Sequence, residues 1–119
     1  MSKNWADVKA SKVEKPWGYE LHWAQTDKYV GKLLFIKAGH RLSKQYHEIK
    51  EETVFVLRGI LYNYDENDQV TQIVPGQSLH VVPGQVHRFA AGDLDVELVE
   101  VSTPHLQDVV RISDDYFRK

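Results

Sequence analysis

The stretch Gly39–Gly59, GHRLSKQYHEIKEETVFVLRG, decides how the rest of this sequence is interpreted. Between its two glycines it holds an amide, an imidazole and a carboxylate, at Gln45, His47 and Glu52, and it then continues as an apolar, β-prone run. In an extended chain residues two apart project to the same face, so Gln45 and His47 point the same way. Glu52 has the opposite parity and can join them only if the charged bridge 48–51 turns the chain before the next strand.

A second histidine with a similar setting follows in Gly76–His87, GQSLHVVPGQVH, where an apolar strand runs into a Pro-Gly turn. Together the two stretches offer one amide oxygen, two imidazoles and one carboxylate. This mixed nitrogen and oxygen set suits zinc, iron, manganese, nickel or cobalt, with positions left open for water or substrate. The chain has no cysteine, so thiolate ligands and disulfides are excluded.

The length, composition and net charge of the chain are typical of one globular domain. The chain has 119 residues, of which 42% are hydrophobic, and its formal net charge is -2. This charge gives no reason to expect nucleic acid or an acidic membrane, so we expect small molecules or a second copy of the chain as partners. Residues 1–18 lack the apolar run of a signal peptide, and no later stretch is long and apolar enough to span a membrane, so we expect a cytoplasmic protein.

Short β-prone runs separated by turns predict an all-β fold of the sandwich or barrel type. The runs are Tyr19–Trp23, Val30–Ile36, Thr53–Leu57, Ile60–Tyr64, Val70–Val74, Leu79–Val82 and Val96–Val101. Thr53–Leu57 is apolar on both faces, which predicts either two packed sheets or cover by a second subunit. Asn4–Lys12 is a candidate helix or part of an arm.

The two quoted stretches resemble the paired motifs of the cupin superfamily. The chain matches the first motif at Gly39, His47, Glu52 and Gly59, and the second at Gly76, Gly84 and His87. Gln45 stands where the first motif usually has a histidine, and Val82 and Ala91 replace the proline and asparagine of the second. The resemblance implies a cupin double-stranded β-helix, a jelly-roll barrel, over residues 15–119, with residues 1–14 as an arm. It also implies one divalent metal ion, held by Gln45, His47, Glu52 and His87.

The replacement of histidine by Gln45 resembles the Gln-x-His form of phosphomannose isomerases. LSKQYH at 42–47, KPWGYE at 15–20 and DVVRISDDYFRK at 108–119 are similar to segments of the cupin domain in bifunctional bacterial mannose-6-phosphate isomerases. The chain departs from that pattern at Lys44, Glu48, Ile49 and Phe117, the last in place of a glycine. The resemblance implies zinc as the first choice of metal, with manganese, iron, nickel or cobalt as alternatives.

The same resemblance implies an aldose–ketose isomerase that acts on a sugar, or a sugar phosphate, through an enediol. We expect Arg88, Glu48 and Lys44 to be its catalytic residues, with His40 as a further candidate for the base. Arg88, Lys44 and Tyr62 are the expected substrate-binding residues, because a guanidinium or ammonium can hold a phosphate and an aromatic ring can stack on a sugar. Cupins are commonly dimers, so the resemblance also implies a homodimer.

Two other functions remain open from the residues alone. Two histidines and one carboxylate also describe the iron site of oxygenases, although a fourth ligand at Gln45 argues mildly against it. A small cupin can also bind a sugar or a metal without turnover, because a fold does not determine a function. Finally, the four polar residues can form a hydrogen-bonded cluster that holds no metal.

Overall fold

The computed structural model describes residues 9–119, and all regular structure in this part of the chain is β-structure. The eleven strands are β1 (Ser11–Lys15), β2 (Gly18–Gln25), β3 (Val30–Ile36), β4 (Lys44–Tyr46), β5 (Glu52–Arg58), β6 (Leu61–Tyr64), β7 (Val70–Ile73), β8 (Ser78–Val81), β9 (Arg88–Ala91), β10 (Val96–Ser102) and β11 (Val110–Ser113). The all-β prediction is therefore confirmed. No helix in the described part is long and apolar enough to cross a membrane.

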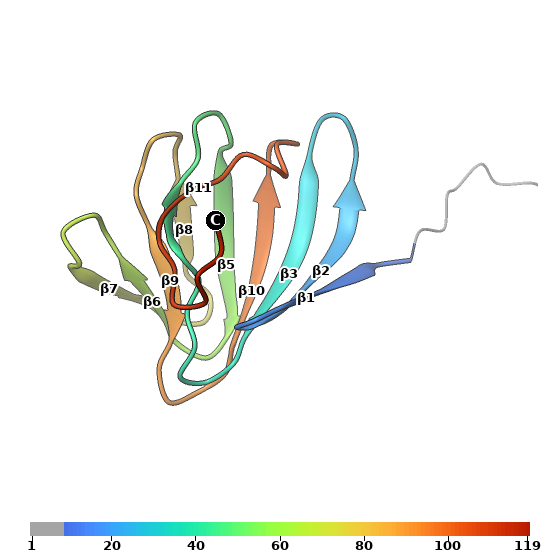
Figure 1. Ribbon diagram of the computed structural model, residues 1–119. Helices are drawn as coiled ribbons and strands as arrows, with labels where there is room; N and C mark the ends of the chain where they lie inside the picture. Colours follow the sequence, from blue (N-terminus) through green and yellow to red (C-terminus); the bar gives the residue numbers. More distant parts are fainter. Residues whose placement is uncertain (1–8) are drawn as a thin grey trace, which may run out of the picture.

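The strands form two layers that face each other (Figure 1). One layer is a six-stranded sheet in the order β1-β2-β3-β10-β5-β8, and every neighbouring pair in it is antiparallel. The other layer contains the pair β11-β4 and the three-stranded sheet β7-β6-β9. Isolated bridges, Arg41 to Ala90 and Gln45 to His87, join these two parts. Because β3 and β10 are central while β1 and β8 are edges, residues far apart in the sequence line one interior.

The hydrophobic core lies between the layers and follows from the period of two along each strand. In β10 the inward residues Val96 and Leu98 are fully buried, and they pair across the sheet with Ile36 and Leu34 of β3. Phe89 of β9 packs into the same core from the opposite layer. Farther along β10 the inward positions become polar, at Glu100 and Ser102. The apolar core thus fills one end of the barrel, and the other end is free to hold charged groups.

Two expectations from the sequence differ from the structure in detail. Of the candidate helix Asn4–Lys12, residues 4–8 lie outside the described residues, and Ser11 and Lys12 belong to strand β1. Residues 11–14, expected in an arm, thus extend the six-stranded sheet by pairing with β2. The strand expected at Thr53–Leu57 forms within β5, but its outward residues Phe55 and Leu57 stay exposed in the single chain. Packing of two sheets therefore covers only the inner face of this strand.

The turn between β1 and β2 depends on the absence of a side chain at Gly18. A Cβ atom at this position would lie 1.9 Å from the carbonyl oxygen of Phe35, because β2 and β3 approach closely there. Since the obstacle is backbone, the two strands must separate to admit even a methyl group.

We expect Gly18→Ala to lower the free energy of unfolding by about 2–3 kcal/mol. The matched control is Gly84→Ala, because Gly84 has a positive φ but open space around its missing Cβ. The control should cost only about 1 kcal/mol, from the left-handed backbone alone. Urea unfolding of both variants measures the difference, and equal losses would contradict the importance of the strand contact.

Candidate metal centre

The two motif stretches meet through the backbone. Gln45 in β4 and His87, just before β9, exchange two backbone hydrogen bonds of 3.0 and 2.9 Å. His47 follows β4 directly, and Glu52 is the first residue of β5 on the opposite sheet. His47, Glu52 and His87 are buried, with 2–4% of each residue exposed. The structure thus brings together three residues that are separated by up to forty positions in the sequence.

The three side chains form a compact group of possible metal ligands. One ligand atom from each of His47, Glu52 and His87 lies within 4.8 Å of the others. Nε2 of His47 is 3.3 Å from Oε2 of Glu52, and Nε2 of His87 is 4.0 Å from Oε1 of the same carboxylate. We call this group the His-Glu-His cluster. Its donor atoms are of the kinds that zinc and other divalent transition metals bind.

Both imidazoles are turned so that Nε2 faces the carboxylate. Nδ1 of His47 is 2.5 Å from the backbone oxygen of Asp108, and Nδ1 of His87 is 3.0 Å from the backbone oxygen of Gln85. A carbonyl oxygen can only accept, so each Nδ1 carries a proton, and each Nε2 is the nitrogen available to a metal ion. Nε2 of His47 is buried and makes no hydrogen bond within the described residues. An unpaired buried nitrogen costs free energy, and a bound cation would relieve that cost.

Asp108 holds the chain that carries His47. Its carboxylate accepts hydrogen bonds from the backbone N–H groups of Glu48, Ile49 and Lys50, at 3.0, 2.7 and 2.8 Å. These three donors, that of Lys50 first, lower the pKa of Asp108 to about 2. The turn predicted between His47 and Glu52 is therefore organised around one carboxylate from the other end of the sequence.

A buried lysine and two buried glutamates adjoin the cluster. Nζ of Lys50 lies 3.0 Å from Oε2 of Glu52 and 3.2 Å from Oε2 of Glu100. Burial lowers the pKa of Lys50, but the charges of Glu100 and Glu52 outweigh it and leave this pKa above its usual value. Burial raises the pKa of Glu52, but His47, Lys50 and His87 together bring it down to about 2. Glu52 is therefore ionised at neutral pH, as a metal ligand must be.

Glu100 behaves in the opposite way to Glu52. Burial is the main cause that raises its pKa, and the negative charge of Glu52 raises it further. His87 is also affected mainly by burial, which lowers its pKa and favours the neutral imidazole that binds metals. The interior thus holds carboxyl groups with opposite tendencies a few ångströms apart, an arrangement typical of acid–base chemistry.

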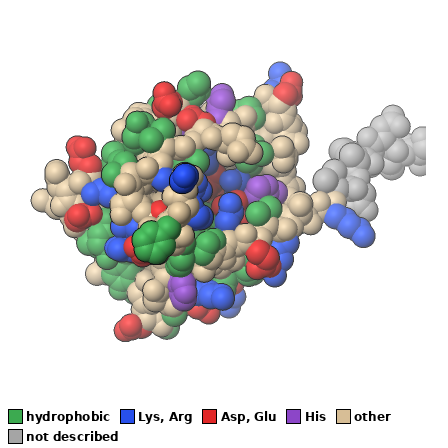
Figure 2. All heavy atoms as spheres, in the orientation of Figure 1, with side chains coloured by type: hydrophobic (Ala, Val, Ile, Leu, Met, Phe, Trp, Pro, Cys, Tyr) green, Lys and Arg blue, Asp and Glu red, His purple; other side chains and the backbone are tan. Residues whose placement is uncertain are grey.

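The cluster borders a cavity of about 390 Å³ between the two layers, within the size range of small-molecule sites. His47, Glu52, Lys50 and Glu100 line this cavity, whereas His87 lines a different pocket. On the far wall, Nε2 of His22 contacts Oε1 of Glu20 at 2.8 Å, and Lys32 contacts the same oxygen at 3.3 Å. Figure 2 shows a hollow in this face of the molecule, with lysine and arginine side chains gathered around it and carboxylates and a histidine beside them.

The structure brings some of the predicted site residues together and leaves others apart. Gln45, the predicted fourth ligand, lines the cavity with His47 and Glu52. Arg88, Glu48, Lys44 and Tyr62, predicted to be catalytic or substrate-binding, do not line it. Arg88 is buried against the backbone oxygen of Leu42, at 2.8 Å, and near Asp115. Glu48 is exposed in the loop that Asp108 holds.

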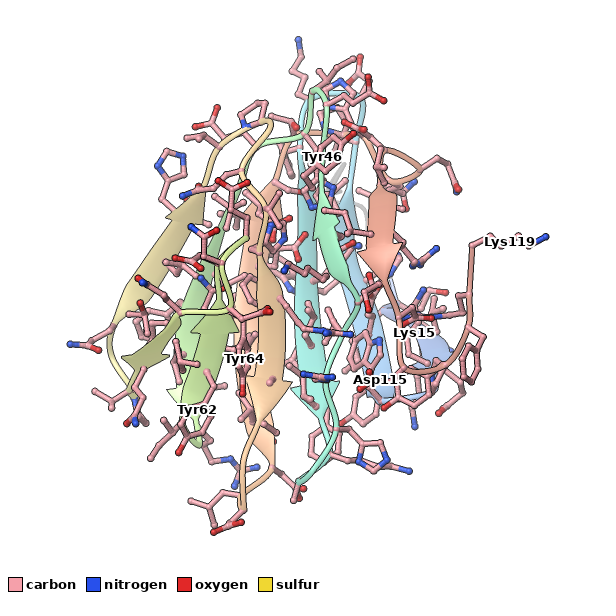
Figure 3. The ribbon with its side chains drawn as sticks, turned by 60° about the vertical axis from the view of Figure 1, so that its left-hand side comes forward. Lys15, Tyr46, Tyr62, Tyr64, Asp115 and Lys119 are labelled. Atoms are coloured by element: carbon pink, nitrogen blue, oxygen red, sulfur yellow. The ribbon has the colours of Figure 1, made fainter. Side chains whose placement is uncertain are left out.

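The other two predicted residues lie in different surroundings. Nζ of Lys44 contacts the backbone oxygen of Glu66, at 2.9 Å, and Oδ1 of Asp68, at 3.2 Å. Tyr62 lines a separate surface pocket next to Gly92, and Figure 3 places it on β6, away from β4 and β11. The roles of Arg88, Glu48, Lys44 and Tyr62 stay predictions from the resemblance.

Sequence reasoning missed Lys50, Glu100 and Asp108 as parts of the site. Lys50 belongs to the charged bridge that was interpreted only as a turn, and Glu100 belongs to the run Val96–Val101, which was interpreted only as a strand. In residues 94–101, LDVELVEV, apolar and acidic residues alternate until Val99, and this break was a usable signal for Glu100. For Asp108 the signal was its place in the Asp-x-x-Arg of the closing segment.

Comparisons with known proteins agree with this geometry. The family model for "Mannose-6-phosphate isomerase C-terminal" matches residues 3–114. Among curated proteins, the chain is 31% identical over 111 residues to the xanthan biosynthesis protein XanB of Xanthomonas campestris pv. campestris, covering 90% of this chain and 24% of that protein. It is 29% identical over 105 residues to a mannose-1-phosphate guanylyltransferase of Sinorhizobium fredii, covering 85% of this chain and 20% of that protein. This chain thus spans about a quarter, or less, of the length of each of these relatives.

Solved structures share the fold at lower identity. The polyketide cyclase RemF of Streptomyces resistomycificus matches with a TM-score of 0.75 and 20% identity, over 94% of this chain and 86% of that one. A sugar phosphate isomerase of the cupin superfamily from Silicibacter pomeroyi matches with a TM-score of 0.64 and 19% identity, over 80% and 68% of the two chains. At such identities the likeness shows the double-stranded β-helix fold alone. With the family match over residues 3–114, however, the chain is a cupin domain that belongs to the mannose-6-phosphate isomerase C-terminal family.

Proposed function

We propose that this chain binds one divalent metal ion, zinc in the first place, and interconverts an aldose and a ketose in a phosphorylated sugar. The observation that carries the proposal is that Nε2 atoms of two imidazoles point at one ionised carboxylate, and that His47 and Glu52 line a cavity large enough for a small molecule. The family to which the chain belongs supports the choice of reaction. A sugar offers adjacent carbonyl and hydroxyl oxygens, which are suitable partners for such a site.

We assign the metal to His47, Glu52 and His87, with the amide oxygen of Gln45 as the fourth ligand. A bound divalent ion would supply Lewis acidity toward the carbonyl and hydroxyl oxygens of the sugar. Lys50 holds the Glu52 carboxylate at 3.0 Å and adds a positive charge to the cavity wall. This charge would favour a substrate whose oxygens become negative during the reaction.

We assign the proton transfer to Glu100. Its carboxyl group lines the cavity, is 3% exposed, and contacts Nζ of Lys50 through Oε2 at 3.2 Å. Burial raises the pKa of Glu100 toward the range in which a carboxyl group can both take up and release a proton. Lys50 lies between Glu100 and Glu52, so Glu100 stands one side chain away from the proposed metal.

The metal assignment predicts that His47→Ala and His87→Ala each abolish stoichiometric metal binding while the fold remains. Wild-type protein purified without chelator should hold about one zinc or manganese ion per chain. Gln45→Ala should weaken affinity without abolishing it. Elemental analysis and far-UV circular dichroism measure the two properties.

His80→Ala is the control for the metal experiment, because His80 is exposed and pairs with Glu51 outside the cluster. This variant should keep the full metal content. Retention of one ion per chain by both His47→Ala and His87→Ala would refute the assignment. Iron accompanied by oxygen consumption would favour an oxygenase instead.

The proton-transfer assignment predicts that Glu100→Gln lowers the turnover number for mannose 6-phosphate by about 100-fold or more, because general acid–base catalysis contributes about 10²–10⁴-fold. Metal content should be unchanged, since Glu100 is not a proposed ligand. Glu97→Gln on the same strand is the control, because Glu97 pairs with Arg58 away from the cavity. Equal turnover by Glu100→Gln and wild-type protein would exclude Glu100 as the proton carrier.

We further propose that the chain forms a homodimer through the outer face of the six-stranded sheet. Phe55 and Val101 are 39% and 52% exposed on neighbouring strands of that face, and Leu57 and Trp23 are exposed as well. An apolar outer face of this kind is typical of a sheet covered by another subunit.

The dimer proposal predicts a dimer by sedimentation equilibrium at tens of micromolar chain. Phe55→Glu should shift the protein toward monomer, because a carboxylate would then be buried in an apolar interface. Val70→Glu, on exposed strand β7 of the other layer, should leave the dimer intact. A monomeric wild-type protein at this concentration would contradict the proposal.

A further inference from the structure

The cationic side chains of the cavity wall are of two kinds. Five of them line the cavity: Lys15, Lys32, Lys50, Arg111 and Arg118. Three have a carboxylate partner: Lys32 with Glu20, Lys50 with Glu52 and Glu100, and Arg118 with Asp114. Among residues 9–119 no Asp or Glu side chain forms an ion pair within 4.0 Å with Lys15 or Arg111. Lys15 is therefore left without an ion-pair partner, and Arg111 is bonded only to an oxygen of Lys119.

Arg111 is placed next to the metal end of the cavity. It lies in β11 directly opposite Gln45 of β4, so the two side chains share one face, with Cβ atoms about 5 Å apart. Nη1 of Arg111 donates to the backbone oxygen of Lys119 at 2.6 Å. Its Nε is buried and has no hydrogen-bond partner in the described chain. The guanidinium edge that includes Nε thus retains donor capacity, and such an edge matches two oxygens of a phosphate.

Lys15 is placed at the border of the same cavity. It is the last residue of β1 and is half-buried. Figures 1 and 3 show the end of β1 beside the C-terminal segment that follows β11. The cavity lining joins Lys15 to Arg111 and Arg118 of that segment. A half-buried ammonium that lines a cavity without an ion-pair partner is available to an anion from solution.

We propose that Arg111 and Lys15 form an anion subsite that receives the phosphate group of the substrate, while the sugar end reaches the His-Glu-His cluster. The subsite rests on the proposed function only in the choice of a sugar phosphate as its ligand. A neutral sugar offers nothing to balance these two charges, whereas a phosphate monoester carries nearly two negative charges at neutral pH. The subsite therefore selects phosphorylated over free sugars.

The subsite differs from the one that the sequence predicts. Arg88 and Lys44 were the expected phosphate ligands, but their charged groups are already bonded to backbone oxygens and to Asp115 or Asp68. They also lie outside the lining of the cavity. Arg111 and Lys15 combine access to the cavity with unused charge.

The experiment measures the binding of inorganic phosphate, mannose 6-phosphate and mannose by titration calorimetry, first to metal-free protein. We expect Arg111→Gln and Lys15→Gln each to weaken binding of both phosphates by about tenfold or more, because each removes a charge-assisted contact. Arg111→Lys should restore part of the affinity. Arg58→Gln, which removes one exposed positive charge that pairs with Glu97, is the control and should bind like the wild type. Added salt should weaken binding to the wild type.

The outcomes separate this subsite from the isomerase reaction. Phosphate binding that depends on Arg111 and Lys15, without conversion of any sugar phosphate, would support the subsite and remove the isomerase proposal. Conversion of mannose 6-phosphate with the same KM in wild type, Arg111→Gln and Lys15→Gln would support the reaction and overturn the subsite. No binding of phosphate to the wild type at about 10 mM, a very weak affinity, or equal binding of mannose and mannose 6-phosphate, would overturn the subsite as well. Far-UV circular dichroism of every variant confirms that it is folded.

Discussion

The burial of the Glu52 carboxylate is the constraint on which the interior of this protein depends. A carboxylate that is almost fully removed from water is unstable unless nearby groups compensate its charge, and removal of a partner from such a group costs about 3–5 kcal/mol. Lys50 supplies one compensating charge, and two imidazoles approach from the other layer. Glu100 contacts the same ammonium group at 3.2 Å, while burial raises the pKa of this carboxyl group. Each charged side chain in this part of the cavity is therefore held in position by contact with its neighbour, and Glu52 is the first of the series.

The fold was predictable because its determinants are local. Turn residues at fixed intervals and alternation along the strands predict the β-strands, and the seven expected runs coincide closely with strands of the structure. The short strands β4 and β11 are different, because they have only three and four residues and form by pairing over a long sequence distance. The same holds for β1, which has one half-buried apolar residue and is held by β2. Strands that depend on a distant partner leave little trace in their own sequence.

The candidate site was predictable to a similar extent, and for the same reason. The alternation of side chains along an extended chain predicted that Gln45 and His47 share a face. The positions of the cupin motifs then predicted that Glu52 and His87 join them. The surroundings of these residues depend on contacts between distant segments, such as Asp108 with the loop after His47, or Lys50 with Glu100 of β10. Arg88 was expected at the substrate because a guanidinium can hold a phosphate, but its guanidinium contacts Leu42 and Asp115. Charge alone does not distinguish a binding residue from one that is already paired.

The hydrogen bonds that orient the imidazoles have a consequence for how this domain can vary. Both acceptors are backbone oxygens, those of Gln85 and Asp108, so the direction of each ring is determined by the path of the main chain. At position 85 the side-chain oxygen accepts a hydrogen bond from the backbone N–H of Val82 at 3.1 Å, so the side chain closes the turn that presents the carbonyl to His87. At position 108 the carboxylate fixes the loop after His47 in the same way, through three backbone N–H groups. A substitution at either position therefore keeps the carbonyl but loosens the loop that aims it.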